Sequence, residues 1–189
     1  MVRFLTGFRF SRLFRPFNRM AGDRSGVSAV EFALILPIIL TLYIGGNEFG
    51  HALTLKRKIT HVTSSIADLV TQSKTISSSD MENILDAAEE ILWPYPATGM
   101  RIVVSLIEID EDNNATVVWS DARNDTALVV GTTVTVPANV DIAETFVVKT
   151  EVHIDYTPQI GYVLTGTLDL GDVFYLRPRQ SATVSCPSC

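Results

Sequence analysis

The sequence predicts an α+β fold: a long N-terminal helix, a short second helix and a small antiparallel sheet packed against them. Three observations predict this arrangement. The run 27–46 is apolar and carries one charge, at Glu31, and apolar residues then recur at helical spacing to about Gln72. From Arg101 onward the chain is rich in Val and Ile and changes to strand character.

Residues 1–26 are predicted to form a basic cytoplasmic leader. They contain six arginines and a single acid, Asp23. Positively charged flanks of an apolar segment stay on the cytoplasmic side of a membrane, which sets the orientation. No small residues of the A-x-A kind follow the apolar run, so we do not expect cleavage by a conventional signal peptidase.

The run 27–46 is predicted to be a transmembrane helix. At a rise of about 1.5 Å per residue it spans roughly 30 Å, which is one hydrocarbon thickness. A glutamate in lipid costs at least a few kcal/mol, so Glu31 is expected to have a partner. The alternative is that Glu31 lies near the cytoplasmic interface and reaches water.

Residues 47–72 are predicted to continue the helix as an amphipathic extension. The apolar positions that indicate it are Phe49, Leu53, Ile59, Val62, Ile66, Leu69 and Val70. The basic cluster 56–58 would invert the orientation if it were the cytoplasmic flank. The leader carries more positive charge, and ten residues separate the cluster from the end of the span, so we keep the first orientation.

A Ser/Thr-rich break at 73–79 precedes the predicted short helix 79–92. Capping residues and early acids mark its start, and Pro94 and Pro96 mark its end. Residues 101–189 are then expected to be mainly β, and the strands are predicted at 101–110, 116–120, 146–156 and 173–184. Pro178 favours an edge or a bulge for the last of them. The segments 126–140 and 161–171 mix apolar and turn residues, and the strand order stays open.

Length and charge limit the class of protein. Beyond the span, residues 47–189 suffice for one modest extramembrane domain, predicted to be periplasmic. The chain has 15 basic and 21 acidic residues; without the leader's six arginines and one aspartate, 9 and 20 remain, a net charge of −11. Such an acidic domain argues against nucleic acid or an anionic membrane surface as a partner.

The motif at the start of the apolar run resembles a known processing site. Gly26, followed by four residues and then Glu31-Phe32, is similar to the prepilin-peptidase site of type IV pilins, especially the G-x-x-x-x-E-[YF] form of tight-adherence (Flp/Tad) pili. The string 26–37, with its proline at Pro37, also resembles the opening of TadE-like pilus assembly proteins. The match is specific over some 25 residues and diffuse beyond them.

The resemblance implies a function and a set of partners. It implies cleavage between Gly26 and Val27, a pilin-like fold, and pairing of Glu31 with the new α-amino group of a neighbouring subunit. The implied partners are the prepilin peptidase, other pilins or pseudopilins, and the Tad inner-membrane assembly platform. The protein would be a single-pass inner-membrane protein with its C-terminal domain in the periplasm, and it could also enter the extracellular pilus.

Other candidate sites are weak. Asp110, Asp112, Asn114 and Asp121 have calcium-loop spacing, but Ala115 replaces the required glycine, so a hairpin turn is the better interpretation. The three histidines, His51, His61 and His153, form no recognisable group, and neither a nucleophile motif nor a phosphate loop is present. We therefore expect no enzymatic activity, no metal and no cofactor.

Cys186 and Cys189 close the chain with the spacing of a redox C-x-x-C pair. They lie at the extreme C-terminus instead of leading a helix in a βαβ unit, so a structural disulfide is the preferred interpretation in an oxidising periplasm. Thiol chemistry stays open as part of a second hypothesis. In that hypothesis the protein is an uncleaved single-pass membrane protein whose periplasmic domain binds a partner or ligand.

Overall fold

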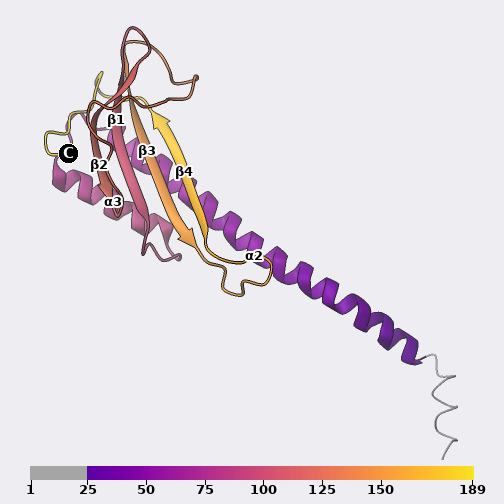
Figure 1. The fold of residues 1–189 in the computed structure, drawn as a ribbon. Coiled ribbons are helices and arrows are strands. Elements are labelled where there is room, and N and C mark those ends of the chain that lie inside the picture. Colours follow the sequence, from indigo (N-terminus) through magenta and orange to yellow (C-terminus); the bar gives the residue numbers. More distant parts are fainter. Residues whose placement is uncertain (1–24) are drawn as a thin grey trace, which may run out of the picture. The chain divides into compact units, whose positions relative to one another are not determined.

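The computed structural model describes residues 25–189, and the predicted leader therefore lies almost entirely outside the described part. The chain divides into two compact units, one ending at Gly45 and the other comprising Gly46–Cys189. The first unit contributes the start of helix α2, which spans Ser25–Thr71 and includes Pro37. The second unit contains the rest of α2 and all other elements (Figure 1).

The second unit has the predicted α+β composition. Helix α3 spans Ser78–Leu92 and is followed by strands β1 (Arg101–Ile109), β2 (Ala115–Arg123), β3 (Thr145–Tyr156) and β4 (Leu168–Leu176). The strands form one sheet in the order β2-β1-β3-β4, and every pair of neighbours is antiparallel. The α+β fold predicted from the sequence is thus confirmed.

Three of the four predicted strands lie close to their predicted positions, and the last does not. The strand expected at 173–184 is instead β4, which begins at Leu168 and ends at Leu176. Pro178 has no N–H to donate to a ladder, which fits an end to pairing before it. Strand β2 is longer than predicted, because its pairing with β1 extends to Arg123.

The core of the second unit lies between the helices and one face of the sheet. On α2 the buried residues recur every three or four positions, which places them on one stripe of the helix. They pack with α3 and with alternate residues of β1 and β3, as the layering in Figure 1 shows. The fully buried members include Ile59, Val62, Ile66, Val70, Met81, Leu92, Ile102, Leu106 and Val152.

Helix α3 begins with a capping box. The Ser77 side chain accepts a hydrogen bond from the Asp80 amide at 3.2 Å, and the Asp80 carboxylate accepts one from the Ser77 amide at 3.0 Å. These two bonds satisfy backbone donors that the first helical turn leaves free. The Ser/Thr-rich break before the predicted helix therefore includes its N-terminal cap.

Candidate processing and assembly site

The motif residues Gly26, Val27, Glu31 and Phe32 all lie in the first turns of α2, and all are exposed. Val27 and Glu31 are four residues apart, so they lie on the same face of the helix. The bond between Gly26 and Val27 is within the first helical turn. Glycine weakens a helix by about 1 kcal/mol relative to alanine, and helix ends fray, so this bond lies where local unwinding costs least.

The helix surface around this motif is apolar. Among residues 25–189, α2 is the one helix long and apolar enough to cross a membrane. Its exposed apolar side chains in the first unit are Val27, Val30, Phe32, Leu34, Ile35, Ile38, Ile39, Leu40, Leu42 and Tyr43. Apolar surface of this extent, unburied within its own chain, requires lipid or another protein around it.

Glu31 is the one charged residue in that apolar surface. Its side chain is exposed, and it forms no hydrogen bond or ion pair with any of residues 25–189. A carboxylate in an apolar surrounding needs a compensating donor or positive charge. Within the described part of the chain, that group is not provided.

Glu48, on the same helix, is in the opposite situation. Its side chain is only 4% exposed, and its carboxylate accepts hydrogen bonds from three successive backbone amides. The N···O distances are 2.9 Å from Tyr162, 3.0 Å from Val163 and 2.9 Å from Leu164. These amides, those of Leu164 and Tyr162 foremost, hold the pKa of the Glu48 carboxyl below its usual value.

The loop that supplies the amides connects β3 to β4. Gly161, immediately before the three donors, has φ +66, a left-handed conformation that glycine adopts without strain. A left-handed residue beside ordinary ones turns successive N–H groups toward one point and forms an anion-binding nest. Glu48 therefore fixes the 157–167 loop to α2. Sequence reasoning did not identify this contact.

A cavity of about 380 Å³ adjoins the Glu48 contact. Its wall comes from α2, from the segment after α3 and from the end of β3 with the loop that follows it. The residues that line it include His51, Tyr95, Tyr156 and Gln159. This cavity lies within the second unit, at the end of the sheet where β3 finishes and β4 begins.

The basic cluster at 56–58 has contacts inside the second unit. Lys56 forms an ion pair with Asp172 of β4 at 3.3 Å and also contacts the Gly171 carbonyl. Lys58 donates a hydrogen bond to the Trp93 carbonyl oxygen at 2.6 Å. These contacts join α2 to β4 and to the segment after α3, which gives two of the three charges a structural role.

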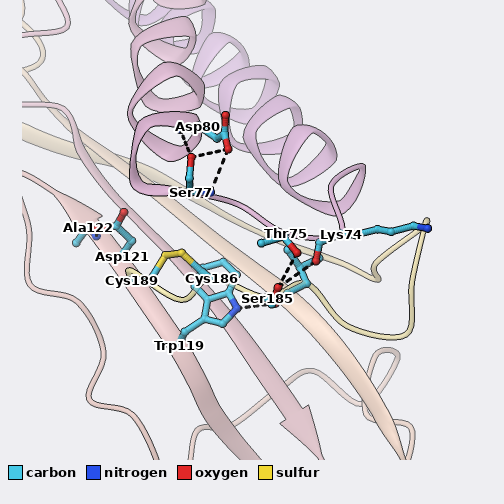
Figure 2. Close-up of a disulfide and its surroundings, with 11 residues drawn as sticks. Lys74, Thr75, Ser77, Asp80, Trp119, Asp121, Ala122, Ser185, Cys186 and Cys189 are labelled. Atoms are coloured by element: carbon cyan, nitrogen blue, oxygen red, sulfur yellow. Dashed lines mark hydrogen bonds between the residues drawn. A yellow bond between two sulfur atoms is a disulfide. The ribbon is translucent and has the colours of Figure 1, made fainter.

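The C-terminal segment is held by a disulfide and by the core (Figure 2). Cys186 and Cys189 are bonded, with a Cα–Cα distance of 5.4 Å. Cys186 is nearly buried, and the Trp119 indole N–H donates to the Val184 carbonyl oxygen at 2.8 Å. Ser185 pairs with the segment before α3, where its amide donates to the Lys74 carbonyl at 3.0 Å.

The other candidate residues from the sequence lie in a turn or on the surface of the second unit. The Asp110 carboxylate accepts hydrogen bonds from the Asp112 and Asn114 amides at 2.9 and 2.8 Å, so it closes the β1–β2 hairpin turn. The Asn114 side chain and amide lower the pKa of Asp110. His51 and His61 are exposed on α2. The His153 Nδ1 atom lies 3.2 Å from the Asp169 Oδ1 atom. Residues 25–189 contain no group of three or more metal-ligating side chains.

Comparison with known proteins adds one finding. Residues 26–68 match the family model described as TadE-like protein, and the match begins at Gly26 of the processing motif. Neither the comparison with curated proteins nor that with solved structures gives a match.

Proposed function

We propose that this TadE-like, pilus-related protein is a minor pilin or pseudopilin of a tight-adherence pilus. In this proposal a prepilin peptidase cleaves the precursor between Gly26 and Val27, and the mature protein keeps its apolar helix. The observation that carries the proposal is the family match over 26–68, which starts at the motif glycine and includes Glu31. The exposure of the motif residues supports access by a peptidase.

The mature protein would act through contacts between subunits. Cleavage gives Val27 a free, positively charged α-amino group. Placed next to Glu31 of a neighbouring subunit, this group would supply the partner that Glu31 lacks among residues 25–189. The apolar helices would pack together in the inner membrane or in the pilus base or tip. Other pilins or pseudopilins and the Tad inner-membrane platform are the proposed partners.

The test is the mass of the intact protein, extracted from its native membrane with and without the prepilin peptidase. We expect a chain that begins at Val27 when the peptidase is active and the full precursor when it is absent. Gly26→Val should accumulate as precursor. Gly46→Val is the matched control, because a Cβ at Gly46 also meets nothing within 4 Å.

A chain that starts at Met1 or Val2 in the presence of active peptidase would contradict the proposal. It would favour the uncleaved single-pass protein with a periplasmic binding domain. The near-complete burial of Cys186 argues against attack by that thiol in this alternative, because reactive cysteines are accessible, whereas Cys189 is exposed.

A further inference from the structure

The loop 157–167 between β3 and β4 exposes an unusual set of side chains. Ile160 is 62% exposed, Tyr162 63% and Val163 47%, and Phe49, which follows Glu48 in the sequence of α2, is also exposed. Single exposed apolar residues are ordinary on a protein surface, but three within four residues of one loop indicate an interaction site. The loop is held in this position by its three amides on Glu48.

The loop is also free of charge in a chain rich in acids. None of its eleven residues is Asp, Glu, Lys or Arg. By contrast, the β1–β2 turn contains Asp110, Glu111 and Asp112. Strand registry places that turn at the opposite end of the sheet, because Arg101 pairs with His153 and Ile109 with Thr145. The 157–167 loop and the β1–β2 turn therefore differ in their charge, and the two acids that flank the loop, Asp155 and Asp169, are both paired with Arg101.

Chain connectivity limits how far the loop can lie from the hydrocarbon core of the membrane. Glu48 follows the predicted span 27–46 by two residues, and two residues reach at most about 7 Å even when fully extended. The polar layer on each side of the hydrocarbon core is about 5–8 Å thick. Whatever the orientation of the two units, the Glu48 carboxylate and the amides bound to it thus lie within or beside the headgroup layer.

We propose that the 157–167 loop is a membrane-interface anchor whose occupant is the lipid bilayer. Ile160, Val163 and Phe49 enter the boundary between headgroups and acyl chains. Tyr162 places its ring there with its hydroxyl toward water, the position that tyrosine favours at membrane surfaces. The contact is apolar, so it does not require attraction between the acidic domain and anionic lipids.

The anchor explains why Glu48 is buried and fully hydrogen-bonded. A free carboxylate at this depth would oppose contact with lipid, whereas three amide donors compensate its charge. The same bonds fix the loop relative to α2, so the periplasmic domain keeps one orientation toward the membrane. The inference rests on the membrane span of the proposed function, but not on cleavage or pilus assembly.

The experiment uses the full chain in nanodiscs of phosphatidylcholine, with single cysteines that carry an environment-sensitive NBD dye. Tyr162→Cys reports on the loop, Ile38→Cys on the span, and Val129→Cys, at an equally exposed apolar position outside the loop, is the matched control. The native pair stays oxidised, so it does not take the label. Lipids with a nitroxide near the headgroup or deep in the chain then quench the dye.

We expect the dye at position 162 to shift to the blue and to lose intensity with the shallow nitroxide, while the dye at 129 keeps its emission. The dye at 38 should be quenched by the deep nitroxide. Adding Glu48→Leu should release the loop and reduce the quenching at 162, whereas Glu108→Leu, at an exposed β1 position, should leave it unchanged.

Three outcomes would overturn the inference, and they are distinguishable. If the dye at 38 is quenched but the dye at 162 responds like that at 129, the span is correct and the anchor is wrong. If the dye at 38 is not quenched either, the membrane span of the proposed function fails as well. If the dye at 162 is shielded in detergent in a manner that depends on protein concentration and not on lipid, a second copy covers the loop.

Discussion

Glu31 and Glu48 are two glutamates on one helix, and their surroundings differ in every respect. Glu31 is exposed in an apolar surface and has no partner among residues 25–189. Glu48 is buried and accepts three backbone hydrogen bonds from the 157–167 loop. A carboxylate whose donors come from its own chain stabilises a fold. Glu31 has no such donor among residues 25–189, and we propose that a neighbouring subunit supplies it.

The same contrast extends to the apolar residues of α2. In the first unit they are exposed, whereas from Leu55 to Val70 the helix buries one stripe against α3 and the sheet. The helix thus serves two environments with one backbone geometry. The change occurs near Gly46, where the chain divides into its two units.

The largest expected effect is the loss of pili in Glu31→Leu. The variant should insert in the membrane normally, because leucine is at least as favourable in lipid, but it removes the carboxylate that we propose to pair between subunits. Counting surface pili by electron microscopy and measuring insertion by carbonate extraction would test this. Pili at the normal level would contradict the pairing.

Glu48→Leu is the matched variant on the same helix. It should keep the Glu31 carboxylate but leave the amides of Tyr162, Val163 and Leu164 without their acceptor, so the loop should open. Hydrogen exchange of these three amides should become faster than in Glu31→Leu. Equal protection in the two variants would contradict the distinction between the two glutamates.

The second prediction compares two isoleucines of α2. Ile66→Ala should lower the free energy of unfolding of the second unit by about 2–5 kcal/mol, because it creates a cavity in the core. Ile38→Ala removes the same atoms from an exposed site and should leave that free energy unchanged. Denaturant unfolding of the full chain in detergent, followed by tryptophan fluorescence, would measure both, because Trp119 is buried in the folded second unit and becomes exposed on unfolding. A similar loss in both would show that the first unit also packs on the domain.

Much of the fold could be predicted from the sequence because the signals were local. The Ser/Thr-rich break and Pro94 bound α3 to within one residue at its start, and Val/Ile-rich runs located β1 and β3. Strand β4 was misplaced because Asp169, Gly171 and Asp172 have low strand propensity. Its position depends on distant contacts instead, such as the ion pair between Lys56 and Asp172.

The Glu48 contact was missed for a similar reason. Its partners are backbone amides more than a hundred residues away along the chain, and no side-chain motif identifies them. Two signals could have indicated it: an acid two residues after the apolar run, and a loop of eleven residues without charge that contains Gly161 and Gly166. The motif at Gly26 was found because it is contiguous.

The third prediction concerns the disulfide that holds the chain end. Replacing Cys186 and Cys189 with serine should destabilise the second unit by about 2 kcal/mol at most, because the bond closes a very short loop. Membrane insertion and processing should not change. Replacing only one cysteine provides the discriminating case: a covalent complex with one specific partner on a non-reducing gel would show a reactive pair.

The smallest expected effect is at the cap of α3. Ser77→Ala removes the side chain that accepts from the Asp80 amide, and N-cap losses of this kind cost about 1 kcal/mol. Ser78→Ala is the control at the adjacent exposed position, since Ser78 is the first helical residue and not the N-cap. Both are measured by denaturant unfolding of the full chain near neutral pH.

The acid of the same capping box adds a pH dependence with a defined sign. Hydrogen bonds from the Ser77 side chain and amide hold the pKa of Asp80 below its usual value in the folded protein. A carboxylate with a lowered folded pKa stabilises the fold fully above its unfolded pKa of about 3.9, and this contribution is lost as the pH falls through the folded pKa.

Asp80→Asn should therefore destabilise α3 near neutral pH and have less effect at about pH 3. Because Asp110 and Glu48 titrate in the same direction, the quantity to measure is the difference between wild type and Asp80→Asn. A difference that grows as the pH falls would show that Asp80 does not stabilise α3 as an ionised cap.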